Sequence, residues 1–413
     1  MNKITITMPK DVAHIIDILE HNGHEAFAVG GCVRDAIMGR EPHDWDITTS
    51  AKPEEVKALF KRTIDTGIQH GTVTVMLNHI GYEVTTYRID GTYTDGRHPE
   101  QVTFTSNLVE DLKRRDFTIN AMAYNNRAGV VDEFGGIDDL KKGIIRCVGI
   151  ATERFTEDAL RILRAVRFSA QLNFTLDDTT AEAIVELGHT LTKISKERIQ
   201  TELDKLITSN HPDRISLIDY YGLGPYIFEG ASVLNKSNPE AYKDIADIMN
   251  ALPADHFLRF ATLLIFEEQP KTVLKKLKLD NHTMDICGKL CAIKCAPLPT
   301  TKPSLRRTIV KYGKEIFDTF AFTFLNALLE AGVYDYMSKD ELNTTIKLYE
   351  EIIADGDCIS LKDMNITGSD LIAMGIPQGK ELGTVLNKLF EQVLDEPSLN
   401  EHETLLKLVS LES

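Results

Sequence analysis

The sequence predicts an α+β protein in which a mixed β-sheet with helices forms the N-terminal part and the remainder is all α-helical. Up to about residue 135, short segments rich in β-branched residues alternate with segments that have helical spacing of apolar residues. Beyond roughly residue 150 strand signals nearly vanish, and runs such as EDALRILRAVRFSAQL, residues 157–172, have helical spacing alone. With 413 residues, the chain is long enough for two to four domains that each have a core.

The first elements follow from apolar spacing and glycine. DVAHIIDILEHNG, residues 11–23, has the pattern of an amphipathic helix that ends at Gly23. AFAV, residues 26–29, predicts a short buried strand, and GGCVRDAIMGR after it predicts a glycine turn that opens a helix. A strand, a turn and a helix are therefore expected in immediate succession around Gly30.

The next elements are mostly β-rich. WDITTS, residues 45–50, predicts a strand, and a helix is expected to begin near Pro53. GTVTVMLNHIGYEVTTYR, residues 71–88, contains two β-rich segments joined by Asn-His-Ile-Gly, which predicts a hairpin. DGTYTDGRHPEQ, residues 90–101, is polar, contains glycine and has no periodicity, so we expect a mobile loop there.

Composition and cysteine usage exclude several classes of protein. No apolar run approaches the roughly 20 residues that span a bilayer, and MNKITITMPK lacks the apolar core and cleavage site of a signal peptide. We therefore expect a cytoplasmic protein without membrane contact. The six cysteines form no CxxC pair. Those of CGKLCAIKC, residues 287–295, would share one helical face, where a metal site is conceivable but burial in a core helix is expected.

Charge is unevenly distributed along the chain. The net charge of -16 argues against a protein that simply coats nucleic acid. Residues 271–314 nevertheless contain eleven Lys or Arg against two acidic residues, Asp280 and Asp285. Such a reversal suits contact with a phosphate backbone, and a solvated helical face is the alternative. The candidate contacts in this segment are Lys271, Lys275, Lys276, Lys278, Arg306, Arg307 and Lys311.

Two aspartates, Asp44 and Asp46, flank the only tryptophan, Trp45. Because successive side chains on a strand point to opposite faces, both carboxylates are expected on one face and Trp45 on the other. Two like charges side by side repel unless a cation lies between them, and Mg²⁺ commonly joins one or two carboxylates to substrate phosphates. The pair therefore predicts a Mg²⁺ site, with a solvated strand face as the alternative.

Two nearby features favour the metal-site interpretation. Gly30 and Gly31, at a strand-to-helix turn, would let backbone N–H groups approach phosphate oxygens, and Arg34 one helical turn further on adds positive charge. Glu83 lies in the middle of YEVTTYR, a segment expected to pair next to the aspartate strand. A third carboxylate there could complete a two-metal site or act as a base toward an attacking hydroxyl.

A further candidate cluster lies in KRRDFTINAMAYN, residues 113–125. Arg114 and Arg115 offer phosphate contacts. Asp116 and Asn120, four residues apart on an expected helix face, could bond a ribose hydroxyl. Charged residues at a helix start are often only caps, but the apolar run that follows favours a binding site.

These motifs together resemble a known family. GGCVRD, DWD, EVTTYR, RRDFTINAMA and EDALRILRAVRF, in this order and spacing, closely resemble the class II tRNA nucleotidyltransferases, the CCA-adding enzymes, within the nucleotidyltransferase superfamily that includes bacterial poly(A) polymerases. The helical remainder is similar to the bacterial form without an HD domain. The resemblance implies a nucleotidyltransferase-fold head at 1–150, a neck with a nucleotide-selecting helix at 151–210, a body at 211–300 and a tRNA-binding tail at 301–413.

The resemblance also implies roles for single residues. Asp44 and Asp46 would hold Mg²⁺ with help from Glu83. The residues that would receive the nucleotide are Gly31, Arg34 and Arg115. The nucleotide-reading residues would be Asp158 and Arg161, with Arg164 and Arg167 further along the same helix. Trp45 departs from the family, in which a smaller aliphatic residue is common, but it should face away from the metal.

Asp158 and Arg161 have an i, i+3 spacing that would place both on one helical face. A surface ion pair is the plain interpretation of such a spacing. As reading residues, a carboxylate acceptor beside a guanidinium donor would match the amino donor and ring-nitrogen acceptor of cytosine and adenine. Uracil and guanine present the reverse pattern, so the pair could select C and A without a nucleic-acid template.

The sequence hypothesis is therefore addition of C, C and A to the 3′ end of tRNA from CTP and ATP, with release of pyrophosphate and Mg²⁺ as cofactor. The acceptor and TΨC arms of tRNA would contact the basic segment, and a homodimer is an open option. The nearest alternative is a poly(A) polymerase or a partial CC- or A-adding enzyme, and residues 90–101 favour full addition. A catalytically inactive tRNA- or nucleotide-binding protein is the second alternative.

Overall fold

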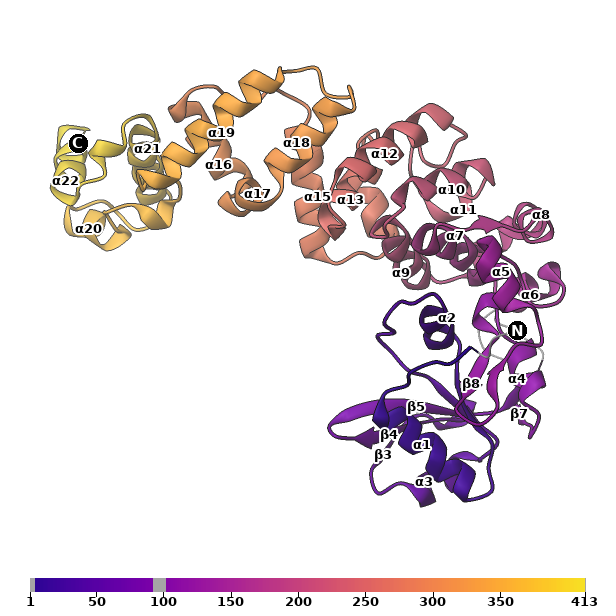
Figure 1. Ribbon diagram of the computed structural model, residues 1–413. Coiled ribbons are helices and arrows are strands. Elements are labelled where there is room, and N and C mark those ends of the chain that lie inside the picture. Colours follow the sequence, from indigo (N-terminus) through magenta and orange to yellow (C-terminus); the bar gives the residue numbers. More distant parts are fainter. Residues whose placement is uncertain (1–3, 92–101, 413) are drawn as a thin grey trace. The chain divides into compact units, whose positions relative to one another are not determined.

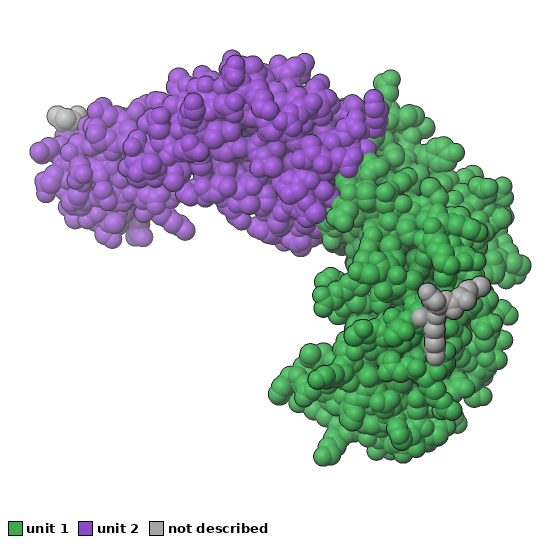
Figure 2. Space-filling model, in the orientation of Figure 1, with its two compact units in different colours: residues 1–242, 276–278 green, residues 243–275, 279–413 purple. Residues whose placement is uncertain are grey.

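The computed structural model describes residues 4–91 and 102–412, and the chain divides into two compact units (Figure 2). The first unit comprises residues 1–242 and 276–278, and the second comprises residues 243–275 and 279–413. Most of the loop expected at 90–101 lies outside the described residues. The finer sequence-based division at residues 150, 210 and 300 stays a prediction.

A seven-stranded mixed sheet forms the base of the first unit (Figure 1). The strand order is β3-β4-β5-β2-β1-β8-β9, and only β2 and β5 among these neighbours run parallel. The strands of this sheet are β1 (Ala26–Val29), β2 (Ile47–Thr49), β3 (Thr63–Gly67), β4 (Thr72–Leu77), β5 (Ile80–Thr86), β8 (Ala123–Asn125) and β9 (Gly129–Val131). Two smaller sheets pair β6 (Arg88–Asp90) with β7 (Val102–Phe104), and β10 (Ile144–Ile145) with β11 (Thr175–Leu176).

The helices of the first unit form two groups, one interspersed with the strands of the sheet and one that follows them in the sequence. Those that accompany the sheet are α1 (Lys10–His21), α2 (Gly31–Ile37), α3 (Pro53–Leu59), α4 (Leu108–Lys113) and α5 (Gly136–Lys142). Those that follow are α6 (Ala151–Glu157), α7 (Leu160–Leu172), α8 (Asp178–Leu187), α9 (Lys196–Ile207), α10 (Ser216–Tyr220) and α11 (Gly224–Ile227). In the described part of the chain β11 is the only strand beyond residue 150, which confirms the predicted α+β class.

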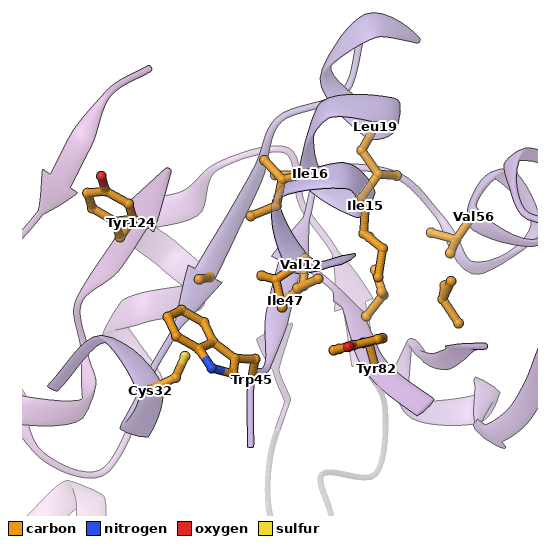
Figure 3. Packing of buried hydrophobic residues seen from close by; sticks show 14 of the residues in the cluster. Val12, Ile15, Ile16, Leu19, Cys32, Trp45, Ile47, Val56, Tyr82 and Tyr124 are labelled. Atoms are coloured by element: carbon orange, nitrogen blue, oxygen red, sulfur yellow. The ribbon is translucent and has the colours of Figure 1, made fainter. Parts of the chain in front are cut away.

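The core of the sheet explains the alternation seen in the sequence. In β5 the buried side chains of Tyr82 and Val84 alternate with the exposed Glu83. Trp45, only 9% exposed, packs in the same apolar cluster as Ile47 and lies beside Cys32 in Figure 3. This core fixes which face of each strand is left for polar side chains.

The predicted hairpin is confirmed, with a tighter turn than the sequence indicated. β4 and β5 pair in antiparallel register down to Leu77 opposite Ile80. Only Asn78 and His79 form the turn, both with positive φ, 49° and 67°, which is the conformation of a two-residue hairpin loop that follows strand twist. The Asn78 amide also donates to the carboxylate of Asp11 at 3.0 Å, so the turn is tied to α1.

From α12 on, the described chain is helical, and most of these helices belong to the second unit. They are α12 (Pro239–Ala251), α13 (His256–Leu263), α14 (Pro270–Lys276), α15 (Asn281–Ile293), α16 (Lys302–Tyr312), α17 (Lys314–Thr319), α18 (Ala321–Glu330), α19 (Lys339–Ala354), α20 (Gly368–Ala373), α21 (Lys380–Asp395) and α22 (His402–Glu412). No helix in the part of the chain that the structure describes combines the length and apolar character needed to cross a membrane.

The cysteines of α15 are packing residues, as expected. Cys287 and Cys291 are buried, with their thiols against the main-chain carbonyls of Phe257 and Ala261 in α13, whereas Cys295 beyond the helix end is exposed. Burial raises the pKa of the Cys291 thiol to about 12, so it stays protonated. Among the described residues no group of three or more His, Cys, Asp or Glu side chains is placed to hold a metal ion.

Candidate active site

The two aspartates lie on one face of an extended segment that leads into β2. The strand begins at Ile47, two residues later than expected, but the Val29 N–H donates to the Asp46 carbonyl at 3.0 Å and continues the antiparallel pairing. Asp44 and Asp46 are exposed, whereas Trp45 between them is buried. The predicted alternation is confirmed.

Glu83 joins these aspartates through strand register. β2 and β5 are parallel with Ile47 opposite Val84, so one position earlier Asp46 lies level with Glu83 on the same face. Desolvation by neighbouring atoms raises the pKa of Glu83, and the charges of Asp46 and Asp44 raise it further. None of the three carboxylates makes a hydrogen bond or ion pair with the described residues. The face therefore carries an uncompensated cluster of negative charge.

The glycine turn adjoins an arginine. Gly30 has φ 84° and ψ -130° and caps α2. A Cβ at this position would lie only 2.9 Å from Nη1 of Arg115, so the close approach of the guanidinium requires glycine. Nη2 of Arg115 lies 3.7 Å from the carboxylate of Asp111, whereas its Nε is buried without a hydrogen-bond partner. The buried Nε atoms of Arg154 and Arg214 also lack a partner, so this feature does not by itself identify a site. At Arg115 it adjoins the glycine turn and the charge of Asp46.

Arg34 begins a chain of polar contacts that runs from α2 to α7. Its guanidinium makes two bonds of 2.9 Å to Asp35 and donates from Nη1 to Asn120 at 2.6 Å. Asn120 donates in turn to Oδ1 of Asp116 at 3.2 Å, and Arg164 donates to Oδ2 of Asp116 at 2.6 and 2.8 Å. These residues, far apart in sequence, are thus brought together, and their role in nucleotide binding stays a prediction.

The helix expected for Asp116 and Asn120 is wrong. α4 ends at Lys113, and Asp116 precedes a short 3₁₀ turn, Thr118–Asn120. The cause is the Asp116 side chain, whose Oδ1 accepts the Phe117 N–H at 2.8 Å and thereby competes with helical hydrogen bonding. The two oxygens of Asp116 accept four bonds in all, which fills their acceptor sites. Burial raises its pKa, but Arg164 outweighs this and holds the pKa well below its ordinary value.

The shared helical face expected for Asp158 and Arg161 is also wrong. Asp158 lies between α6 and α7 in extended conformation, φ -142° and ψ 103°. Its Oδ1 accepts the Leu160 N–H at 3.0 Å, and such a side-chain bond to the first turn of a helix favours a break at this residue. Its Oδ2 accepts a bond of 2.7 Å from Arg198 in α9, so Asp158 is not paired with Arg161.

Arg161 is held by a different set of partners. Its Nη1 donates to the Glu157 carboxylate at 2.6 Å and to the Arg154 carbonyl at 3.2 Å. Its Nη2 donates to the carbonyl of Arg114 at 3.0 Å. Three of its five N–H donors are therefore occupied and two remain for a ligand.

Arg167 is placed differently from its neighbours on α7. It is buried, bonds Glu202 of α9 at 2.5 Å and lies 3.8 Å from the centroid of the Phe168 ring. Arg34 and Arg164 lie over the same ring at 5.2 and 5.5 Å. These contacts favour a packing role for Arg167 over the predicted nucleotide contact, because its guanidinium already has partners inside the protein.

Part of the basic segment is also committed to internal ion pairs. Arg306 is buried and bonds Asp357 at 2.7 Å, which disfavours its predicted tRNA contact. Arg307 bonds Glu391 and Asp395 at 2.7 and 2.9 Å. Both arginines tie α16 to later parts of the second unit rather than present free charge.

The candidate lysines of this segment are more exposed to solvent than Arg306 and have weaker ion pairs or none among the described residues. Lys275 and Lys278 are exposed. Lys271 and Lys276 make surface pairs with carboxylates at 3.8 and 3.3 Å, which are weak in solvent. Lys311 lies 4.7 Å from the ring of Tyr312. The open positive charge of residues 271–314 is therefore smaller than the sequence count.

Several partners were not found by sequence reasoning. Asp111 precedes Arg115 by four residues, and Glu157 precedes Arg161 by four, a spacing of opposite charges that is readable from sequence. Asp35 adjoins Arg34 directly. Arg198 and Glu202 come from α9, and no local signal links them to residues about 40 positions earlier.

Three family models match successive parts of the chain. Residues 26–146 match the Poly A polymerase head domain, and residues 173–234 match a family described as a probable RNA and SrmB-binding site of polymerase A. Residues 256–409 match the putative domain 2 of tRNA nucleotidyltransferase. The three matches together cover the sheet, the helices from α8 to α11 and most of the second unit, and they leave out residues 147–172 with α6 and α7.

Relatives match from end to end. The CCA-adding enzyme of Leuconostoc mesenteroides is 39% identical over 96% of this chain and 95% of its own length, and that of Levilactobacillus brevis is 36% identical over 96% of both. The solved structure of the Bacillus stearothermophilus CCA-adding enzyme in complex with CTP is 30% identical, with a TM-score of 0.80 over 98% of this chain and 99% of that one. On this evidence the chain belongs to the CCA-adding enzymes.

Proposed function

We propose that this protein adds C, C and A to the 3′ end of tRNA, using CTP and ATP and releasing pyrophosphate. The observation that carries the proposal is the open face of Asp44, Asp46 and Glu83 beside Arg115 and the turn at Gly30, in a chain whose relatives match it over nearly their full length. The attacking group would be the 3′ hydroxyl of the tRNA, and the attacked atom the α-phosphorus of the nucleotide.

The residues present fit a divalent cation, and we propose Mg²⁺. Asp44 and Asp46 offer hard oxygen ligands from one face of the segment before β2, and neither side chain is taken by a described residue. Two carboxylates are the number that Mg²⁺ commonly takes when substrate phosphates supply further ligands. When bound, the ion lowers the pKa of an attacking hydroxyl and stabilises charge on the leaving group. Glu83 adds negative charge at the edge of the same site.

The triphosphate would be bound by the glycine turn and Arg115. The Gly30 N–H is taken by the Met122 carbonyl at 3.1 Å. The Gly31 N–H at the start of α2 would therefore be the backbone donor for a phosphate oxygen. The buried Nε–H of Arg115 has no protein acceptor, so a phosphate oxygen would satisfy it. Asn120 would contact the ribose, while Asp116, whose acceptor sites are full, would orient Asn120 and Arg164.

The base would be read by Asp158 and Arg161 from fixed positions. Asp158 uses one acceptor site on each oxygen for Arg198 and for the Leu160 N–H, and keeps the others. Arg161 keeps two N–H donors. An acceptor and donors held in this way match the Watson–Crick edges of cytosine and adenine and leave uracil and guanine with unpaired groups.

We further propose that the protein works in the cytoplasm and that exposed lysines such as Lys275 and Lys278 contact the acceptor and TΨC arms of tRNA. Their phosphate contacts would make affinity fall with salt. A homodimer stays a prediction, which sedimentation at several protein concentrations tests.

The deciding experiment incubates the purified protein with Mg²⁺ and a tRNA that lacks its last three nucleotides. CTP and ATP are supplied separately and together, and product length is read at single-nucleotide resolution. Two additions with CTP alone and three with both are expected. A long adenylate ladder would instead indicate a poly(A) polymerase, a stop after two C a partial enzyme, and no extension a binding protein.

A further inference from the structure

A buried carboxylate lies behind the proposed active site and has no role in the reaction as outlined. Asp111, the fourth residue of α4, has a fully buried side chain. Its Oδ2 accepts the Thr48 hydroxyl at 3.1 Å, and its Oδ1 accepts the Arg88 N–H at 3.3 Å and Nε of Arg114 at 2.9 Å. Thr48 belongs to β2, the strand that directly follows Asp46. The carboxylate is therefore anchored to the strand that carries the aspartates.

The same carboxylate makes the one ion pair that Arg115 forms with the described residues, at 3.7 Å from Nη2. Nη1 of Arg115 lies against Gly30, and Nε is buried without an acceptor. Thus Nη2 faces the Asp111 carboxylate, Nη1 lies against the glycine turn, and Nε has no partner. One side of the group is fixed while the other is left for a ligand.

We infer that Asp111 is a positioning residue for triphosphate binding: it holds Arg115 against the turn at Gly30 so that the unpartnered Nε–H is offered to a phosphate oxygen. This rests on the proposed function, because it takes Arg115 as a triphosphate contact. A buried donor without a partner is costly, and a ligand oxygen at that position removes the cost. Fixing the guanidinium in advance means that little side-chain entropy is lost when the nucleotide binds.

The electrostatics are consistent with an ionised Asp111. Burial alone would raise its pKa, but Arg114 and Arg115 outweigh burial, and the pKa of Asp111 lies below its ordinary value. The carboxylate also offsets the repulsion between these two adjacent cations. A neutral side chain of the same shape would leave both arginines without this counter-charge.

The position of Asp111 predicts which kinetic constant it controls. CTP and ATP share the triphosphate, and Arg115 is not among the residues proposed to read the base. Loss of the Asp111 charge should therefore raise KM for both nucleotides by the same factor and leave the choice of base unchanged. A residue that only supports the fold would lower the active fraction, and hence kcat, without moving KM.

The test compares Asp111→Asn with the wild-type protein in the tRNA extension assay. KM for CTP and KM for ATP should each rise about tenfold, the equivalent of one charge-assisted hydrogen bond. Preference for CTP over UTP should stay at the wild-type value. Inorganic tripolyphosphate, which has no base, should lose affinity by the same factor when it is measured by calorimetry with Mg²⁺.

Asp139→Asn is the matched control. Asp139 is another buried carboxylate of the first unit, bonded by the Thr118 hydroxyl at 2.7 Å and by Nε of Arg146 at 3.1 Å. Its replacement removes the same kind of bonds at a place without contact to Arg115. This variant should melt at a lower temperature and keep the wild-type KM.

Unchanged KM values for both nucleotides in Asp111→Asn, together with a fall in melting temperature like that of Asp139→Asn, would overturn the inference. If Asp111→Asn does not fold, Thr48→Val removes one bond to the carboxylate and keeps the shape, and it should raise both KM values by a smaller common factor. Wild-type KM values in that variant would be equally decisive against it. Failure of the wild-type protein to extend tRNA would refute the proposed function, whereas tripolyphosphate affinity still decides the role of Asp111.

Discussion

The carboxylates of the sheet and the charged residues at the start of α7 present opposite arrangements. Asp44, Asp46 and Glu83 lie on an open face, and their side chains make no hydrogen bond or ion pair with the described residues. Asp158 and Arg161 each have protein partners, Arg198 for the first and Glu157 for the second. In the proposed reaction the first group would bind an ion that arrives with the substrate, whereas the second group is already held by ion pairs in the protein alone.

The two groups affect the stability of the folded protein in opposite ways. Desolvation and the charges of Asp46 and Asp44 raise the pKa of Glu83, so three ionised carboxylates on this face are unfavourable for the fold, and a cationic ligand would compensate them. At α7 the ion pairs hold side chains in single positions, as selection by hydrogen-bond pattern requires. Substitutions of the sheet carboxylates should therefore lower activity without lowering stability. Substitutions of the partners at α7 should change the choice of base by moving the residues that read it.

The largest effect is expected for Asp46→Asn and Asp44→Asn. Either change should lower nucleotide incorporation at least about 100-fold, the usual cost of losing a group that stabilises transition-state charge. The free energy of unfolding should stay constant or rise, because one of three repelling charges is gone. tRNA binding, measured by filter retention, should be unaffected. Asp138→Asn removes an exposed carboxylate of α5 and serves as control; turnover near the control level in either aspartate variant would refute the assignment.

The next effect concerns the pair of Asp116 and Arg164, which is already formed in the protein alone. Asp116→Asn leaves Arg164 with only the more distant Glu202 carboxylate, at 3.8 Å, as counter-charge and should cost about 3 kcal/mol of unfolding free energy at pH 7. Because the folded-state pKa of Asp116 is lowered, its contribution is complete above the unfolded pKa and is lost as the pH falls toward the folded value. Urea titrations should show a constant difference above about pH 5 that shrinks below about pH 4. A pH-independent difference would mean that the charge of Asp116 is not what stabilises the fold.

Arg198→Met tests whether the partner of Asp158 matters for base choice. Loss of the 2.7 Å bond frees the carboxylate, and preference for CTP over UTP should fall about ten- to 100-fold. Arg198→Lys keeps the charge and should restore part of the preference. Arg214→Met is a matched control, since Arg214 bonds Asn173 instead. Equal losses of CTP and UTP incorporation in Arg198→Met would assign Arg198 to folding alone.

The open face was readable from sequence, and the partners at α7 were not. Period-two alternation separated Asp44 and Asp46 from Trp45, and pairing of nearby strands brought Glu83 beside them. Both are local rules, and the structure confirms them. The helical spacing of residues 157–172 continued smoothly across Asp158 and therefore hid the break there.

That break depends on a single side-chain bond to the Leu160 N–H and on Arg198, which is distant in sequence. The predicted helix through Asp116 failed for the same reason, because the Asp116 side chain bonds the Phe117 N–H. At both places an aspartate competed with helix formation through its own carboxylate. The periodicity of a sequence reflects the spacing of its apolar residues and does not indicate such side-chain hydrogen bonds.

The smallest effect should distinguish backbone strain from close approach at the glycine turn. Gly30 and Gly39 both have positive φ, 84° and 71°, so alanine is strained at either position. The strain is larger at Gly30, because its ψ of -130° lies outside the left-handed helical region. A Cβ at Gly30 would meet Arg115 at 2.9 Å, whereas at Gly39 nothing lies within 4 Å. Both alanine variants should therefore lose stability, Gly30→Ala the more, but only Gly30→Ala should displace the guanidinium and raise KM for CTP and ATP several-fold. Equal KM values in the two variants would show that Arg115 reaches the triphosphate from another side, and the open face of the sheet would then lack its proposed cationic neighbour.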